Sequence, residues 1–545
     1  MIFFSVPSLA KYNSMKKILI LILFLVLGWA ASTWFIGNET ESLLKTYLQN
    51  SKKAYAEMGM ETQYEMKEYK KSFLKSTAKT VFSLNTGDAE IDAIFKDLQF
   101  NNTITHGPIL WVGGVPSFGT AHIHSTLDVD ALEPEAKTLL KLIFADNNPL
   151  SANITFGLNE TADYELIIPA IEIKEEDSYF NLKEGIYISG IFNKSTLIGT
   201  AKGTFGSLAV KDDGLIINAS ASSLEIDMQG LVAGQMIGAA HFSIPSIKIE
   251  AEAMPPISFG IDFNSDTRKV NGDALEGDIK LIASNIKAPL EMTDITLNAS
   301  FNGLQIKGLE QLVAIQTDLQ QLQAGASKGK GNPNEEEQAA LMNKLQNLPN
   351  IMAAALQNTF KKDQTAISIS ADIVAKQDNS HLAIKSHYIG NGADINLEEL
   401  TTGGLAAILK IVNGSLDLKA SKAMLASTPA AIVLLPLIKQ GLIVESEKSY
   451  TLNAIFKADG ITLNDKVMTA DAFAKVLEVG GVTGSDNELP AGIELPDEEK
   501  QVLMQDIPPQ LLEELATQSI EALKEQGLPE EIIEQIKVIK QQKAE

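Results

Sequence analysis

The sequence predicts an α+β fold of mainly antiparallel, long and curved β-sheets with packed helices, preceded by one N-terminal transmembrane helix. Three observations support this prediction. An uncharged apolar run stands near the N-terminus, alternating apolar and polar residues fill most of the region that follows, and only a few stretches show helical spacing. Because many strands follow one another without intervening helices, antiparallel pairing is expected.

The composition excludes several classes of protein. The chain has 545 residues, no cysteine and a formal net charge of −24. Without cysteine there is no disulfide framework, thiolate nucleophile or iron–sulfur cluster. Arg268 is the single arginine in an acidic chain, and phosphate contacts depend on clusters of Arg and Lys. We therefore expect no nucleic-acid partner.

The first element is the run from Ile18 to Ile36, which carries no charge. At 1.5 Å per residue it reaches roughly 28 Å, close to the thickness of a bilayer's hydrocarbon core. Lysines precede the run and acidic residues follow it, so the positive-inside rule places residues 1–17 in the cytoplasm and exports the chain from residue 37 onward. A cleaved signal peptide is the alternative, and both Met1 and Met15 are possible starts.

Residues 37–365 are predicted to form a strand-rich region with helices near 39–58, 308–323 and 335–358. In Ile295–Phe301 every second residue is apolar, as in a strand with one buried face. The third helix follows Asn332 and Pro333, which suit its N-cap and first turn. The small and polar residues 324–333 between the last two helices predict an exposed loop, and their spacing does not match that of a phosphate-binding loop.

Residues 366–470 are predicted to form a second strand-rich region, with a helical stretch near 420–440 and a closing hairpin. Residues 471–545 form an acidic tail with two predicted helices, at about 509–526 and 529–542. An apolar stripe from Leu512 to Leu523 marks the first of them. The stripe suits either a docking element or a small local core.

Short motifs in a fixed order suggest a family. They are Tyr69, Ser76 and Ala78 at a strand start, then His106, Gly107 and Pro108, and finally Gly441, Tyr450, Gly460 and Asn464. Over roughly residues 15–470 the chain resembles the YdgA-like family of bacterial proteins of unknown function, and it departs from that family's pattern at Ser72 and Asp465. The resemblance implies a bacterial inner-membrane protein facing the periplasm, and it supplies no catalytic residue. Turn chemistry alone explains the Gly and Pro positions.

The candidate metal ligands are His122 and His124, which share one face of a strand, with His106 and Asp128 nearby. No acidic residue stands in the required frame, so surface histidines are the preferred interpretation. His381 and His387 have no accompanying catalytic motif. We expect no metal, no cofactor and no enzyme activity.

Three functional hypotheses remain. The preferred one is a non-enzymatic envelope protein, anchored in the inner membrane, that scaffolds protein partners. The first alternative is binding or transfer of lipid or another apolar envelope molecule in a sheet-lined groove, where small side chains leave room. Its candidates are Ala219, Ala221, Ala299, Ala371, Ala454 and Ala458. An envelope hydrolase is the second alternative, and the oligomeric state is left open.

Overall fold

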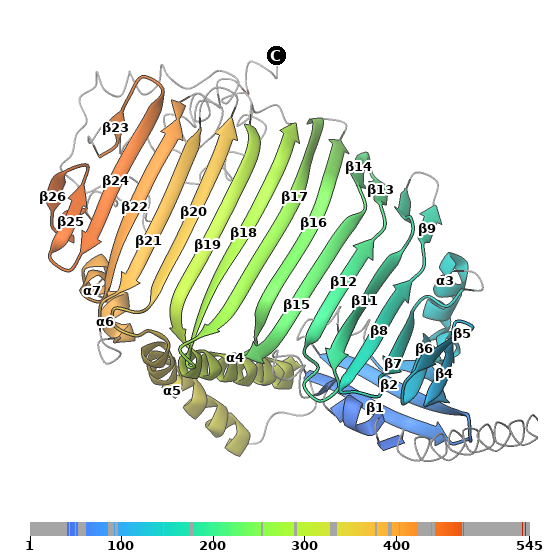
Figure 1. The fold of residues 1–545 in the computed structure, drawn as a ribbon. Helices are drawn as coiled ribbons and strands as arrows, with labels where there is room; N and C mark the ends of the chain where they lie inside the picture. Colours follow the sequence, from blue (N-terminus) through green and yellow to red (C-terminus); the bar gives the residue numbers. More distant parts are fainter. Residues whose placement is uncertain are drawn as a thin grey trace, which may run out of the picture. The chain divides into compact units, whose positions relative to one another are not determined.

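The computed structural model describes residues 41–473, together with 537 and 540. Within 41–473 the exceptions are 43, 50, 53–60, 86–91, 93–95, 145–146, 175–177, 252–253, 288–291, 328–334, 376–378, 391–394, 403, 423–437, 439–441 and 471. The chain divides into two compact units, residues 1–431 with 438–471 and residues 432–437 with 472–545. All the labelled helices and strands belong to the first unit (Figure 1).

Strands dominate the first unit. In its first half they are β1 (Glu61–Lys70), β2 (Lys75–Asn85), β3 (Leu98–His106), β4 (Ile109–Val112), β5 (Val115–Phe118), β6 (Ala121–Leu127), β7 (Ser151–Phe156), β8 (Thr161–Ile168), β9 (Ile171–Lys174), β10 (Tyr179–Leu182), β11 (Ile186–Asn193), β12 (Gly199–Phe205), β13 (Leu208–Asp212) and β14 (Leu215–Ala219). The longer strands follow. They are β15 (Ser222–Val232), β16 (Gln235–Ala251), β17 (Met254–Val270), β18 (Ala274–Lys287), β19 (Met292–Gln305), β20 (Ala366–Ala375), β21 (Ser380–Tyr388), β22 (Val412–Ser421), β23 (Val444–Glu445), β24 (Ser449–Lys457), β25 (Gly460–Leu463) and β26 (Lys466–Met468).

The strands form one 24-stranded sheet and a separate two-stranded hairpin, β4–β5. All the described pairings are antiparallel. The main sheet runs in the order β1-β2-β3-β6-β7-β8-β11-β12-β15-β16-β17-β18-β19-β20-β21-β22-β24-β25-β26. Because β16 is 17 residues long, its second half also pairs with β14, which begins the branch β14-β13-β10-β9. Strand β23 pairs with β24.

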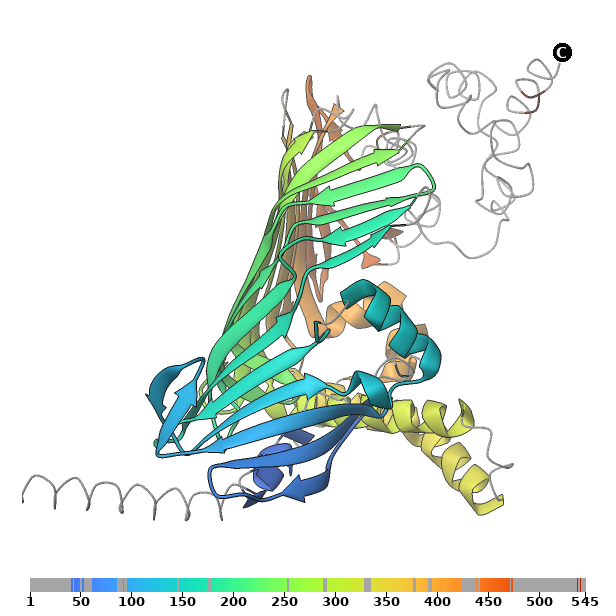
Figure 2. The same cartoon turned by 90° about the vertical axis from the view of Figure 1, so that its right-hand side faces the viewer.

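Helices cover only parts of this sheet. They are η1 (Val129–Ala131), α3 (Pro134–Phe144), α4 (Ile306–Ser327), α5 (Glu335–Thr359), α6 (Leu397–Thr402) and α7 (Gly404–Ile411). Residues 41–42, 44–49 and 51–52 are also helical, and they are called the N-terminal helix. In the view of Figure 2, α3, α6 and α7 lie on the same side of the sheet.

Two clusters of buried side chains form the core. In the first, Leu44 and Leu48 of the N-terminal helix pack on β2, β3, β6 and β7, where Ile104 is 0% and Phe156 is 1% exposed. In the second, Tyr388 and Ile411 pack with Leu356 of α5 at the other end of the sheet. These two clusters lie near the ends of the sheet, and single buried side chains such as Ile237 and Leu275 lie on the strands between them.

The structure confirms the mainly antiparallel β-sheet and the helices predicted near 308–323 and 335–358. The described part of the helix predicted at 39–58 is helical from 41 to 52, apart from the undescribed 43 and 50, and buries Leu44, Leu48 and Ser51. The loop predicted at 324–333 begins inside α4, which continues to Ser327.

One helix was not predicted. It is α3, which starts at Pro134 between β6 and β7. The helical stretch predicted near 420–440 falls mostly on residues that are not described; within it β22 continues to Ser421, and positions 422 and 438 are helical. The helices α6 and α7 lie earlier in the chain. Strand β22 extends to Ser421 because it pairs with both β21 and β24 along its length, so pairing determines its end.

Several predictions fall outside the described residues. These are the anchor from Ile18 to Ile36, residues 53–58 of the first predicted helix, Asn332 and Pro333, Gly441, and the acidic tail apart from four single positions. Among the residues that the structure does describe, no helix is both long and apolar enough to span a bilayer. The predicted boundary at 365/366 falls between β19 and β20, which pair directly, so the two strand-rich regions contribute to one sheet.

Candidate functional site

A continuous row of apolar residues crosses one face of the sheet. Paired residues point to the same face of an antiparallel sheet, so the ladders can be followed from strand to strand. From β8 to β24 the row reads Leu166, Ile188, Gly203, Leu224, Phe242, Phe263, Leu281, Leu297, Ala371, Leu382, Leu418 and Leu452. No position in this row carries a polar side chain.

A second row runs beside the first, two residues along each strand. It reads Tyr164, Gly190, Ala201, Ile226, Ala240, Ser265, Ile279, Ala299, Ile369, Ile384, Leu416 and Ala454. Only Tyr164 and Ser265 bring a polar side-chain atom. These two rows together are called the apolar face of the sheet.

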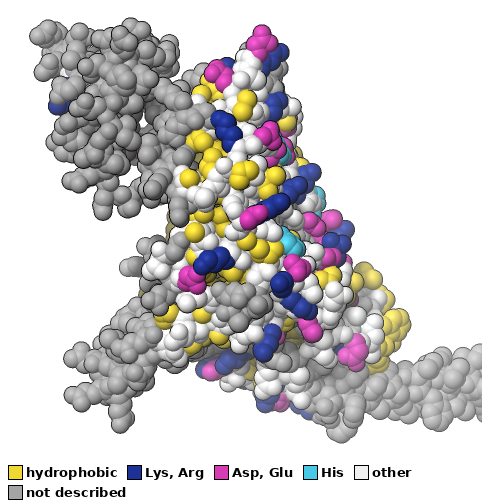
Figure 3. Space-filling model, turned by 90° about the vertical axis from the view of Figure 1, so that its left-hand side faces the viewer, with side chains coloured by type: hydrophobic (Ala, Val, Ile, Leu, Met, Phe, Trp, Pro, Cys, Tyr) yellow, Lys and Arg dark blue, Asp and Glu magenta, His cyan; other side chains and the backbone are white. Residues whose placement is uncertain are grey.

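The opposite face has the reverse chemistry. The row between the two apolar rows reads Glu165, Ser189, Lys202, Glu225, His241, Asn264, Lys280, Asn298, Ser370, Ala383, Asp417 and Asn453. Ala383 is its one apolar member. Figure 3 shows the difference at one end of the sheet, where hydrophobic side chains gather on one side and charged ones on the other. The sheet is thus amphipathic across its width.

The apolar face is largely uncovered. Of its first row only Gly203 and Leu452 are buried. In the middle, on β18 to β21, four large side chains are strongly exposed: Ile279 at 39%, Leu297 at 44%, Ile369 at 52% and Ile384 at 45%. Soluble proteins rarely leave a contiguous apolar surface of this kind without a partner or ligand. This patch of four side chains is the centre of the candidate site.

Helices cover the apolar face at its two ends. The N-terminal helix packs on the side chains of Ile104, Ile123 and Phe156, and Tyr164 packs against the same cluster. At the far end, α7 contacts β22 and β24, while α4 and α5 contact β19 in the middle. Among the described residues, no helix covers the patch of Ile279, Leu297, Ile369 and Ile384, which leaves a half-open apolar surface.

The six alanines proposed for a groove fall into two groups. Ala299, Ala371 and Ala454 belong to the apolar face, where they separate larger side chains. Ala221 and Ala458 lie in exposed turns, and Ala219 pairs within the β13-β14-β16 branch. Only the first three therefore contribute to the candidate site.

The histidines do not converge. His122 and His124 share the polar face, and their Nδ1 atoms lie 2.9 Å from Thr155 Oγ1 and 2.8 Å from Asn153 Oδ1. His106 pairs with Ala121 and so points to the opposite face of the sheet. Within the described part of the chain, no three His, Cys, Asp or Glu side chains come close enough to hold a metal ion. Asp128 instead forms an ion pair with Lys79, at 3.1 Å.

The first group of family motifs forms a buried contact. Ser76 Oγ lies 2.8 Å from His106 Nε2, and both residues are at most 1% exposed. Burial lowers the pKa of the His106 imidazole and raises that of the neighbouring Tyr69 phenol. The pair resembles a nucleophile–base dyad in distance, yet no substrate could reach atoms buried so completely. Its role is structural.

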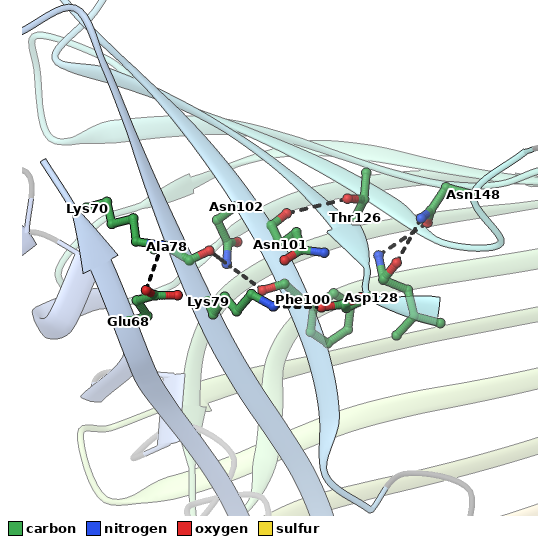
Figure 4. Close-up of polar contacts among 11 residues, drawn as sticks. Glu68, Lys70, Ala78, Lys79, Phe100, Asn101, Asn102, Thr126, Asp128 and Asn148 are labelled. Atoms are coloured by element: carbon green, nitrogen blue, oxygen red, sulfur yellow. Dashed lines mark hydrogen bonds and ion pairs between the residues drawn. The ribbon is translucent and has the colours of Figure 1, made fainter. Parts of the chain in front are cut away.

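A second buried polar group joins the same strands. Asn102 Nδ2 donates to the carbonyl oxygens of Ala78 and Phe100, and its Oδ1 accepts from Ser125 Oγ at 2.6 Å. Figure 4 shows the two contacts of Asn102 Nδ2 beside the Lys79–Asp128 pair. Satisfied buried polar groups of this kind fix strand register.

The closing hairpin motifs also have structural roles. Asn464 and Asp465 have positive φ angles, and the amide side chain of Asn464 bonds the backbone of Asn453 and Leu442. The ammonium of Lys422 lies 5.1 Å from the ring centre of Tyr450. Asp465 lies in the left-handed backbone region, which Asp and Asn adopt more readily than most residues.

A shallow hollow of about 550 Å³ lies on the polar face, lined by Arg268, Asp278, Lys385 and His387 among others. Arg268 makes ion pairs with Asp266, Glu276 and Asp278, at 3.4 to 3.5 Å. The single arginine is therefore engaged by neighbouring carboxylates.

Sequence reasoning missed most of the apolar face. Its signal was present strand by strand, as alternation in β15, β19 and β20, but the rows appear only when the register of every ladder is known. It also missed the hairpin β4–β5, whose signal is an uncharged run around Gly113 and Gly114.

Comparison with known proteins gives a family and nothing finer. The model of the family described as "Bacterial protein of unknown function (DUF945)" matches residues 15–471. No curated protein and no solved structure matches the chain. The matched range covers most of the sequence and contains every strand of the sheet. The chain therefore belongs to this bacterial family of unknown function.

Proposed function

We propose that the apolar face binds the acyl chains of lipids, in a non-enzymatic protein anchored to the bacterial inner membrane through Ile18–Ile36. The observation that supports this proposal is the exposed apolar face, which crosses the strands from β8 to β24. The two apolar rows hold no charged residue, and the row between them, on the opposite face, holds several. The proposal includes a periplasmic location for the sheet and membership of the YdgA-like family.

The dimensions suit acyl chains. Neighbouring strands lie about 4.8 Å apart, so eleven steps from β8 to β24 extend about 53 Å. One leaflet contributes about half of a bilayer's roughly 30 Å hydrocarbon core, so one acyl chain needs about 15 Å. The apolar face as a whole is long enough for several acyl chains in sequence, and its strongly exposed part from β18 to β21, three steps or about 14 Å, is long enough for one. Such a length would allow a bound lipid to move along the face as well as to be held there.

The chemistry favours lipid over protein as the occupant. A protein interface carries about one hydrogen bond per 100–200 Å². In the two apolar rows only Tyr164 and Ser265 offer a side-chain polar atom, and the Tyr164 hydroxyl already donates to the Thr200 carbonyl at 3.4 Å. An acyl chain needs no hydrogen bond. The scaffolding hypothesis depends on the acidic tail, which lies outside the described residues.

Site-specific photo-crosslinking tests the proposal on the full chain in growing bacteria. A photoreactive phenylalanine at Leu297 or at Ile369 faces the proposed lipid, while the adjacent positions Asn298 and Ser370 place the same group on the polar face. These neighbours are matched controls, because each lies one residue away on the same strand.

We expect lipid adducts, identified by mass after proteolysis, at Leu297 and Ile369 and not at the two controls. Crosslinks from these positions to another protein, or to the tail of the same chain, would show that a polypeptide covers the face. Equal lipid labelling at all four positions would indicate contact with lipid that does not depend on the face. Either result contradicts the proposal.

A further inference from the structure

Two neighbouring loops expose large apolar side chains at one end of the sheet. They are the β1–β2 turn, residues 70–75, and the hairpin β4–β5, residues 109–118. Together they are called the docking tip. The backbone amide of His106 donates to the Leu74 carbonyl at 3.1 Å, which joins the loops at their base. The tip lies apart from the apolar face, since the hairpin is not part of the main sheet.

The hairpin presents an apolar surface to solvent. Ile109 pairs with Phe118 and Trp111 with Pro116, so these four side chains share one side of the hairpin. Their exposure is high: Phe118 is 73%, Trp111 65% and Ile109 37% exposed, and Val115 at the turn reaches 66%. The turn residues Gly113 and Gly114 have positive φ and nothing near them. A hydrophobic surface at a protruding turn contributes little to folding.

The β1–β2 turn adds apolar and cationic groups. Phe73 and Leu74 are 46% and 47% exposed. Lys70, Lys71 and Lys75 flank them, and no acidic residue occurs from position 69 to 79. The ion pair of Lys70 with Glu68, at 2.8 Å, is strongly exposed and therefore weak. A chain of net charge −24 thus concentrates positive charge beside its exposed apolar side chains.

The base of the tip is rigid. Leu110 is fully buried beneath the hairpin, and a Cβ at Gly107 would lie 1.6 Å from the carbonyl oxygen of Gly119. The Ser76–His106 contact joins the end of the first turn to the start of the hairpin. The family motifs therefore hold the two loops in place. This gives Ser76, His106 and Gly107 a role that turn chemistry alone did not supply.

The tip also lies near the predicted anchor. Tyr69, one residue before the turn, packs on the cluster that contains Leu44 of the N-terminal helix. From Ile36 to Glu41 the chain spans at most about 18 Å. If Ile18–Ile36 crosses the membrane, the start of this helix and the tip beside it lie within reach of the bilayer surface.

We propose that the docking tip inserts its exposed side chains into the surface of an anionic bilayer. Aromatic residues favour the interface between headgroups and hydrocarbon, and Trp111 is the only tryptophan outside the predicted anchor, which holds Trp29 and Trp34. Each lysine near an anionic surface is worth about 1 kcal/mol. A protein partner would need a cleft to bind the protruding β4–β5 hairpin, whereas a bilayer can accept the hairpin without a preformed cleft.

The absence of cysteine makes a direct test possible. A single Val115→Cys substitution carries an environment-sensitive fluorophore on the full chain, reconstituted in vesicles of phosphatidylethanolamine and phosphatidylglycerol. Ser223→Cys is the matched control, because Ser223 is exposed on the polar face of β15. Both positions are at the surface, so neither label disturbs packing.

We expect the label at position 115 to shift to the blue and to be quenched by nitroxide-bearing lipids, while the label at 223 is quenched only by aqueous iodide. Lys71→Gln and Lys75→Gln should each lower the ratio of inserted to exposed label by about fivefold. Equal access of iodide to both labels would overturn the proposal. So would protection from iodide without lipid quenching, which would indicate that the label is covered by protein, either the same chain or a second copy. A vesicle assay of the tip is independent of crosslinking at the apolar face, so either proposal can fail alone.

Discussion

Replacing the four exposed side chains at the centre of the apolar face should abolish lipid binding without unfolding the protein. The change is threonine at Ile279, Leu297, Ile369 and Ile384. Threonine retains strand propensity and removes most of the apolar surface. Because these side chains are between 39% and 52% exposed, much of their surface is left for a ligand to cover.

The magnitude follows from that exposure. Complete burial of an Ile or Leu side chain is worth about 1.5–3 kcal/mol, so covering the exposed two fifths to half yields about 1 kcal/mol per residue. Four residues give about 4 kcal/mol, or roughly a thousandfold in affinity. One substitution alone should weaken binding about fivefold. These values assume that a bound acyl chain covers each side chain fully.

The assay is the affinity of the purified full chain for a pyrene-labelled phospholipid, with the unfolding midpoint followed by circular dichroism. The matched control has threonine at Lys280, Asn298, Ser370 and Lys385, on the polar face of the same strands. We expect the control to bind normally. A folded apolar-face variant with unchanged affinity, or an equal loss in the control, would refute the reasoning.

Three further predictions concern the core and the base of the tip. Ser76→Ala removes the hydrogen bond to buried His106 and should destabilise the protein by about 1–3 kcal/mol in urea unfolding, with Ser72→Ala as an exposed control. Burial lowers the folded-state pKa of His106 and His122 below the ordinary value of 6.5, so the unfolded chain binds protons more readily than the folded one. The contribution of these histidines to stability should be complete above pH 6.5 and should fall as the pH drops below it. His106→Gln should make the free energy of unfolding depend less steeply on pH. Ile104→Ala, at a 0% exposed position, should cost about 2–5 kcal/mol, and a loss below 1 kcal/mol would contradict the assignment of this core.

Local patterns predict the strands well. The alternation in Ile295–Phe301 places Leu297 and Ala299 on one face and Asn298 on the other, as the ladder with β20 confirms. Helix α3 was missed although Pro134 is well placed for a first helical position. The spacing carried the signal as well, because Ala136, Leu139, Leu140 and Ile143 recur at helical intervals after Pro134. This helix could therefore have been predicted from the sequence.

The candidate site could not be predicted in the same way. Each apolar row depends on eleven successive registers, and bulges shift several of them, for example between Met228 and Gly230. A shift of one residue in any ladder would move the next strand's side chains to the other face. The faces on which the histidines lie also depend on register. His122 and His124 were correctly placed on one face, but only the pairing of His106 with Ala121 shows that His106 lies on the other.

The positions of the core, the apolar face and the tip support a division of roles within one sheet. Leu44 and Leu48 fill the apolar side of β2, β3 and β6, so the region beside the tip is closed by protein. Side chains of the uncovered rows become strongly exposed only further along, at Ile279 and beyond. A lipid held there is separated from the tip by this packed core. Under the two proposals, the tip holds the protein against a bilayer and the apolar face shelters acyl chains away from it. The middle of the sheet can stay open because the antiparallel ladders satisfy the backbone hydrogen bonds of the strands without a complete second layer.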